Sequence, residues 1–221
     1  MEELSSLTLQ QAVNRSTIIG VALAVFVGII RFRSLSPDLR WLAILNWFEL
    51  PIEVGAYILI LLQKSNLFLM PIYTIGEFAI LTLVYRQALR SAIFDKISFW
   101  LIGAFAAYSL VDSFWTSTTL EWFRPGQQVI QSLLILGLVT LYFRKLLNEL
   151  SVAKLSREPM FWVSIGLTVY FLGYLQIALF SNYLLQHYSA QLNANVCTIQ
   201  SALHIFLHLC YAYALWMRPQ K

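Results

Sequence analysis

Charge is scarce in this sequence: Asp, Glu, Lys and Arg make up 12% of the 221 residues, whereas 59% of the residues are hydrophobic. Soluble domains usually carry about 25% charged residues. A soluble fold of this size could not bury so much apolar surface. The composition therefore predicts an integral membrane protein.

Several functional motifs are also missing. The sequence has no G-x-x-x-x-G-K-[ST], G-x-G-x-x-G, H-E-x-x-H or G-x-S-x-G pattern, which argues against nucleotide hydrolysis and soluble-kinase activity. The hydrophobic runs contain no lysine, so a retinal Schiff base has no attachment point. The net charge of +4 is typical of membrane proteins with basic cytoplasmic loops and does not indicate nucleic-acid binding.

Seven hydrophobic runs are long enough to cross a bilayer as helices, which takes about 20 residues. They predict an all-α, polytopic membrane protein, a seven-transmembrane helix bundle that forms a single domain over residues 1–221. The polar N-terminus lacks the basic start of a secretory signal, so we expect the first run to be retained. The predicted spans are 16–30, 41–62, 67–85, 97–116, 127–143, 160–184 and 196–217.

The basic residues predict the orientation of the bundle. Only Arg15, Lys64 and Arg124 of the 15 basic residues lie on the side of the predicted N-terminus. Cytoplasmic loops are enriched in Lys and Arg, so we expect the N-terminus outside and the C-terminus in the cytoplasm. The residues on the cytoplasmic side are Arg31, Arg33, Arg40, Arg86, Arg90, Lys96, Arg144, Lys145, Lys154, Arg157, Arg218 and Lys221.

Four acidic residues fall inside these spans: Glu49, Glu53, Glu77 and Asp112. A buried ionisable residue costs about 2.5–3.5 kcal/mol on insertion scales, and each one is therefore a candidate for function. No Lys or Arg lies deep in a span, so the available cationic partners are two histidines of the last span. His204 and His208 are one helical turn apart and share a face.

The spacing of the polar residues groups them on inward faces, because lipid offers polar groups no partner. At 1.5 Å per residue, Glu53, Glu77, His204 and His208 all lie about 12–18 Å from the outer surface. If the second, third and last spans are neighbours, these side chains can meet. The candidate ligand-binding residues are Glu49, Glu53, Tyr73, Glu77, Asp112, Tyr170, Tyr174, Gln200, His204, His208 and Tyr211.

Four interpretations of this cluster remain open. It could be a structural hydrogen-bond network, an outward-facing pocket for a small or lipidic ligand, a metal site, or a path for protons or ions. His-x-x-x-His plus carboxylates from other helices supplies zinc or iron ligands. For a metal, the candidate ligands are Glu53, Glu77, His204 and His208.

Two segments, PIYTIGEFAILTLVYR (71–86) and REPMFWVSIGLTVYFLGYLQIALFSNYL (157–184), resemble a group of uncharacterised bacterial seven-helix proteins common in Bacteroidetes. Similar segments serve as membrane sensor regions in front of histidine kinases. The resemblance implies a multi-pass protein of the bacterial inner (plasma) membrane, a sensing role and a separate cytoplasmic signalling partner.

The segment SALHIFLHLC (201–210) is similar to the last helix of the superfamily of alkaline ceramidases and progestin–adipoQ receptors, which are zinc amidases. Only His204 and His208 match that family's pattern. The family's third histidine has no counterpart within the spans, so Glu53 or Glu77 would have to replace it. The leading interpretation is a receptor or sensor, and the alternative is a metal-dependent intramembrane hydrolase acting on a lipid.

Overall fold

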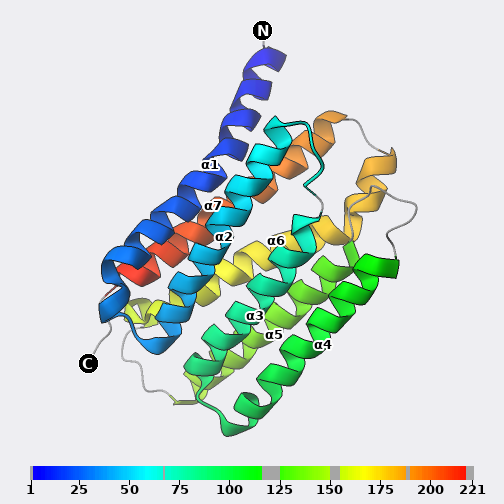
Figure 1. The fold of residues 1–221 in the computed structure, drawn as a ribbon. Coiled ribbons are helices and arrows are strands. Elements are labelled where there is room, and N and C mark those ends of the chain that lie inside the picture. Colours follow the sequence, from blue (N-terminus) through cyan, green and yellow to red (C-terminus); the bar gives the residue numbers. More distant parts are fainter. Residues whose placement is uncertain (1, 67, 116–124, 150–154, 188–189, 218–221) are drawn as a thin grey trace.

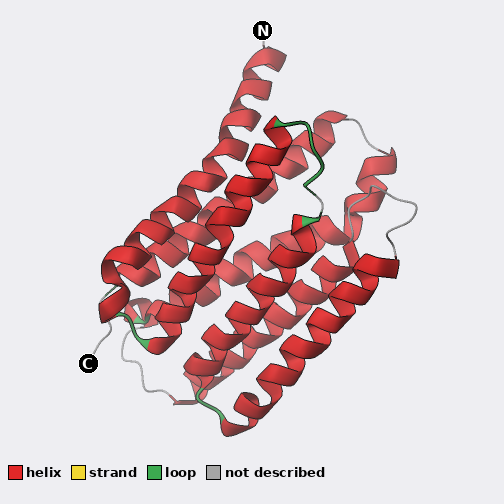
Figure 2. Ribbon diagram, in the orientation of Figure 1, coloured by secondary structure: helices red, strands yellow, loops and turns green. Residues whose placement is uncertain are grey.

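The computed structural model describes residues 2–66, 68–115, 125–149, 155–187 and 190–217. Every regular element in these ranges is a helix (Figure 2). The long helices are α1 (Glu2–Arg31), α2 (Pro37–Leu61), α3 (Leu69–Leu89), α4 (Ala92–Trp115), α5 (Pro125–Glu149), α6 (Pro159–His187) and α7 (Ala190–Trp216); η1 (Phe32–Ser34) and η2 (Leu155–Arg157) are short 3-10 turns.

Seven helices in the described ranges are long and apolar enough to cross a membrane, which confirms the predicted all-α membrane bundle. The candidate spans are 16–34, 37–61, 69–89, 92–113, 126–148, 159–180 and 195–216, close to the predicted ranges. The main difference is α1, which continues as a helix back to Glu2, well before the predicted span begins at Ser16.

Proline and backbone geometry explain several helix ends. Helices α2, α5 and α6 begin at Pro37, Pro125 and Pro159, where the missing N–H costs no hydrogen bond. Helix α3 ends at Arg90, which adopts the left-handed conformation with φ of 48°. Pro51 lies inside α2, and the helix continues through it.

Six of the helices form a ring, in which neighbours pack in the order α1, α2, α3, α5, α6, α7 and back to α1 (Figure 1). Helix α4 lies outside this ring, against α3 and α5. The two ends of the chain lie at opposite ends of the bundle. The backbones of α2 and α7 come close to each other at only a few positions, because α1 packs against both helices. Side chains therefore span the interior between α2 and α7.

Small residues on α6 bring α6 and α7 close together. A Cβ atom on Gly166 would lie 2.9 Å from the Cβ of Cys210, and one on Gly173 would lie 2.4 Å from Cδ1 of Leu203. At Gly166 the contact is with an atom attached to the α7 backbone, whereas at Gly173 it is with the end of a flexible side chain. Gly166 in particular therefore allows the close approach of these helices.

The outer surface of the bundle is hydrophobic, as a lipid-facing surface requires. All seven long helices expose large apolar side chains, among them Ile29, Ile58, Ile72, Trp100, Leu133, Leu172 and Leu209. The dry part of the core is formed by the first half of α2, the second half of α3 and the residues opposite them, including Leu42, Leu81, Ile135, Leu167 and Leu215. Glu53, Glu77 and His204 lie in the other half of the interior, while a few buried polar residues, among them Thr82 and Ser164, lie within the apolar part.

Candidate functional site

One face of α2 presents three polar side chains to the interior. Asn46 is fully buried, Glu49 is 1% exposed and Glu53 is half-buried. They share a face because three- and four-residue steps return to the same side of a helix. Tyr57, one more step along, is also half-buried. The predicted stripe on α2 thus lies inside the bundle.

The opposite stripe lies on α7. His208 is fully buried and His204 is 8% exposed, and both rings face α2. Tyr211 is fully buried beyond His208, with the two rings 5.4 Å apart. Cys197 lies at the matching helical step before Gln200, but it is exposed. The inward stripe therefore begins after Cys197.

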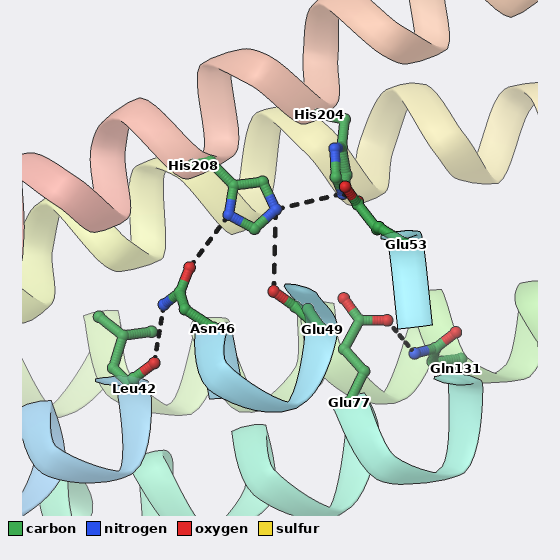
Figure 3. Close-up of polar contacts among 8 residues, drawn as sticks. All are labelled: Leu42, Asn46, Glu49, Glu53, Glu77, Gln131, His204 and His208. Carbon is green, nitrogen blue, oxygen red and sulfur yellow. Dashed lines mark hydrogen bonds and ion pairs between the residues drawn. The ribbon is translucent and has the colours of Figure 1, made fainter. Parts of the chain in front are cut away.

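The two stripes meet through the histidines (Figure 3). Nε2 of His208 lies 3.2 Å from Nε2 of His204 and 3.8 Å from Oε2 of Glu49. Nε2 of His204 lies 3.4 Å from Oε1 of Glu53. The equal depth estimated for Glu53 and His204 from the sequence corresponds to a direct contact. Two ring nitrogens and two carboxyl groups therefore face one small volume.

Asn46 fixes the orientation of the His208 ring. The Asn46 side-chain amide donates from Nδ2 to the carbonyl oxygen of Leu42 at 2.8 Å, which leaves Oδ1 as the atom facing His208. This oxygen lies 3.1 Å from Nδ1 of His208, so Nδ1–H is the donor. In the neutral ring, Nε2 then carries a lone pair that points at His204 and Glu49.

Glu77 belongs to a second, separate pair. Nε2 of Gln131 on α5 donates to Oε2 of Glu77 at 2.7 Å and lies 3.4 Å from the carbonyl oxygen of Thr74. Both side chains are almost fully buried. Glu77 is therefore held by an amide of α5 and not by a histidine of α7, although both groups border the same interior space.

That space is a cavity of about 360 Å³. It is surrounded by side chains of α1, α2, α3, α5, α6 and α7 and contains two carboxyl groups and one imidazole but no lysine or arginine. Aromatic rings form one wall: Tyr170 and Tyr174 stack at 5.6 Å, and the Tyr170 ring lies 5.7 Å from that of His204. The polar lining residues are Thr17, Glu53, Asn66, Tyr73, Thr74, Glu77, Gln128, Gln131, Tyr170, Tyr174, Gln200, Ser201 and His204.

Of the residues predicted from the sequence, seven line the cavity: Glu53, Tyr73, Glu77, Tyr170, Tyr174, Gln200 and His204. Glu49, His208 and Tyr211 lie behind this lining. Asp112 belongs elsewhere, because its carboxyl Oδ2 accepts from Nε2 of Gln127 at 2.7 Å where α4 meets α5. The cluster therefore draws on all of the predicted acids except Asp112.

Sequence reasoning missed the contribution of α5 and the role of Asn46. Gln128 and Gln131 line the cavity and are almost fully buried. As polar residues inside a hydrophobic run they carry the same kind of signal as Glu49 and Glu53, and their three-residue spacing puts them on one face of α5. Asn46 carried this signal too, but only its contact with His208 shows what it does.

Several polar atoms of the cluster have no hydrogen-bond partner although they are buried. They are Oε2 of Glu49, Oε2 of Glu53, Nδ1 of His204 and the hydroxyl of Tyr211. Buried polar groups in folded proteins are nearly always satisfied, by protein, water or a bound ion. The donor set of Glu53, His204 and His208 is of the kind that holds a metal, and its ligand atoms all lie within 4.8 Å of one another.

No protein-family model, curated protein or solved structure matches this chain. The function must therefore be argued from the cavity and the Glu/His cluster themselves.

Proposed function

We propose that this chain is a receptor or sensor of the bacterial inner membrane that binds a small or lipidic ligand in the cavity, next to the Glu/His cluster. The N-terminus is outside, the C-terminus is cytoplasmic, and a separate cytoplasmic protein receives the signal. One observation carries the proposal: a 360 Å³ cavity with polar residues from six helices, inside a bundle that is otherwise apolar.

The chemistry of the lining supports a ligand better than a purely structural network. Ligand sites of small molecules measure about 300–1,000 Å³ and combine apolar walls with a few polar groups that fix orientation. Hydrogen bonds between membrane helices contribute only about 0.6 kcal/mol on average. That gain does not offset the burial of Glu49, Glu53 and Glu77, so a bound group must interact with the unpaired oxygens.

The position of the cavity supports access from outside. Its lining includes Asn66, in the connection between α2 and α3, together with Thr17 of α1 and Ser201 of α7. The connection between α2 and α3 lies at the end of the bundle where α1 begins (Figure 1). The positive-inside bias places this end outside. A ligand from outside thus reaches Glu53 and His204 without crossing the dry half of the core.

Metal-dependent hydrolysis of a lipid is the second candidate. The observation that favours it is the spacing of the Glu53, His204 and His208 ligand atoms. Zinc hydrolases hold the metal with three protein ligands and keep one position for water or substrate. Such a reaction would occur in the same cavity. The two candidates differ in the fate of the bound molecule, which a receptor releases unchanged and a hydrolase cleaves.

The proposal is tested by identifying molecules that co-purify with the protein. Wild-type protein is extracted in detergent, purified and denatured, and the released small molecules are measured by mass spectrometry. Ala56 lines the cavity, and the Ala56→Phe variant should fill part of it. The matched control is Ile58→Phe, because Ile58 is on the same helix but 49% exposed on the outer surface.

We expect a molecule present in wild-type protein and in Ile58→Phe but at least tenfold reduced in Ala56→Phe. Equal amounts of every co-purifying molecule in the three proteins would contradict ligand binding in the cavity. Hydrolysis is distinguished by incubating the purified protein with the same molecule and measuring cleavage products.

A further inference from the structure

The three donors of the Glu/His cluster are spaced as ligands of one metal ion are. In a tetrahedral site with metal–nitrogen and metal–oxygen distances of about 2.0–2.1 Å, neighbouring ligand atoms lie about 3.3–3.4 Å apart. Nε2 of His204 is 3.2 Å from Nε2 of His208 and 3.4 Å from Oε1 of Glu53. Two of the three ligand-to-ligand distances thus match a tetrahedral site without rearrangement.

The Nε2 atoms of the two histidines point at one place beside the Glu53 carboxyl, where a proton or a metal ion can lie. His208 uses Nδ1–H for Asn46, so its Nε2 offers a lone pair toward the donors. His204 directs its own Nε2 at the same point, with the Glu53 carboxyl beside it. Either a proton on Nε2 of His204 or a metal ion at this point keeps the two ring nitrogens and the carboxylate from repelling one another.

The residues around these donors resemble the outer shell of a metal site. Metal-binding histidines usually donate their other ring N–H to an oxygen, which fixes the tautomer and the ring. The chain Leu42 carbonyl, Asn46 amide and His208 ring does this from α2 to α7 (Figure 3). The Glu49 carboxyl, 1% exposed and with Oε2 unpartnered, lies 3.8 Å from the same ring nitrogen.

We infer that Glu53, His204 and His208 bind a divalent transition-metal ion, zinc or ferrous iron, at the base of the cavity. Two histidines and one carboxylate are a donor set that both metals use, and both leave positions open for other ligands. Glu53 and His204 line the cavity, so an open position faces it. That position suits a ligand with an oxygen or nitrogen lone pair, a detail that rests on the proposed ligand binding.

Glu77 is not part of this metal site, although its depth in the membrane matched that of Glu53. Its Oε2 is taken by Gln131, and its carboxyl is outside the group of ligand atoms that lie within 4.8 Å of one another. The two glutamates therefore form a matched pair for a test: both line the cavity, both are largely buried, and only one belongs to the metal site.

The test measures metal content. The protein is purified without immobilised metal or chelators and loaded with zinc sulfate, or with ferrous sulfate under anaerobic conditions. Unbound metal is removed by gel filtration, and bound metal is measured by plasma mass spectrometry. Two near-isosteric variants, Glu53→Gln and Glu77→Gln, are compared with wild-type protein, and a monodisperse elution profile confirms that each one folds.

We expect one ion per chain in wild-type protein and in Glu77→Gln, and at least a tenfold weaker affinity in Glu53→Gln and His204→Gln. Zinc binds such sites more tightly than ferrous iron in general, so the metal is identified by the ion that the protein carries when it is purified without added metal. Metal far below one ion per chain in both arms would overturn the inference, and so would equal binding by Glu53→Gln and Glu77→Gln. The first result would mean that a proton, and not a metal, lies between the histidines, and the second that Glu53 is not a ligand.

A second measurement tests the outer shell. Asn46→Ala removes the acceptor for His208 and should weaken metal binding about 10–100-fold, as is usual for such positioning residues. Asn46→Asp keeps an oxygen acceptor and should restore affinity to within a few-fold of wild type. Equal affinities of all three proteins would show that His208 is not a ligand.

The metal and ligand proposals can fail separately. Ala56→Phe should keep its full metal content, because Ala56 is not a donor, while losing the co-purified molecule. Bound metal in a protein that carries no cavity ligand would support the metal site and reject the receptor proposal. A cavity ligand in a protein that binds no metal would support the receptor and reject the metal site.

Discussion

Oδ1 of Asn46 on α2 lies 3.1 Å from Nδ1 of His208 on α7, and this contact joins two helices whose backbones approach each other only sparingly. The amide is itself fixed by the carbonyl oxygen of Leu42. A short polar side chain thus sets the direction of an imidazole on the other side of the bundle interior. The orientation of Nε2, and with it the geometry of the whole Glu/His cluster, depends on this contact.

Asn46→Ala should destabilise the protein. Loss of one partner leaves the buried Nδ1–H of His208 unsatisfied, which costs about 1–3 kcal/mol. The measurement is thermal unfolding in detergent followed by fluorescence. Thr140→Ala is the control, since the Thr140 hydroxyl is exposed and bonds only within its own helix, to the carbonyl oxygen of Leu136. Equal melting temperatures of the two variants would contradict the role of Asn46.

Gly166→Ala should be more harmful than Gly173→Ala. The new methyl at Gly166 would lie 2.9 Å from the Cβ of Cys210, an atom attached directly to the α7 backbone. At Gly173 it would meet only the end of the flexible Leu203 side chain. Overpacking typically costs about 1–3 kcal/mol, and we expect Gly166→Ala near the upper end.

The control for both substitutions is Gly103→Ala, because a Cβ there would meet nothing within 4 Å. This variant should be neutral or slightly more stable, since Ala is favoured over Gly in a helix by about 0.8–1.0 kcal/mol. Denaturation of the three variants in the same detergent gives the ranking. A Gly173→Ala variant less stable than Gly166→Ala would show that α6 and α7 are separated by other contacts.

The orientation of the bundle is tested with reporter fusions. A reporter after Lys221 or between Arg90 and Ser91 should be active in the cytoplasm, and one inserted at residues 188–189 should be active outside. The basic connections that follow α1, α3 and α5 predict this arrangement. Reversed activities would place the mouth of the cavity in the cytoplasm and reject an external ligand.

Glu158, which precedes α6 outside the membrane-spanning segments, predicts a pH dependence. Burial and the nearby Asp38 raise the pKa of Glu158 above its ordinary value of 4.5, although Arg90 opposes this. The folded state therefore binds a proton more tightly than the unfolded state does. The charge of Glu158 costs stability as the pH rises above 4.5, and at lower pH the cost disappears.

Glu158→Gln should therefore melt higher than wild type at pH 8, by about 1–3 °C, which corresponds to less than about 1 kcal/mol in a chain of this size. The difference should shrink toward zero near pH 4. Melting curves across this range provide the measurement. A melting-temperature difference that is constant with pH would show that Glu158 is not responsible.

The sequence predicted the helices and the depth of the polar residues but not their pairing. Hydropathy located all seven spans, because a bilayer imposes a length and an apolar composition on each helix. Depth and helical face placed Glu53 opposite His204, and the two are in contact. Depth alone could not separate Glu53 from Glu77, because it does not say which helices are neighbours.

The pairing depends on the order of helices around the ring. Helix α5 lies next to α3, so Gln131 reaches Glu77 first. Helix α1 packs against both α2 and α7, which leaves Glu53 and Asn46 to reach the histidines across the interior. These pairings depend on how whole helices pack, and the spacing of residues along the sequence does not predict them.

The most direct test of the account is X-ray absorption spectroscopy at the zinc edge of the zinc-loaded protein. We predict a first shell of nitrogen and oxygen at about 2.0–2.1 Å, with the outer-shell scattering of two imidazole rings, and in His204→Gln either the scattering of one ring or loss of the bound zinc. Zinc surrounded only by oxygen, without imidazole scattering, would contradict a metal centre formed by Glu53, His204 and His208.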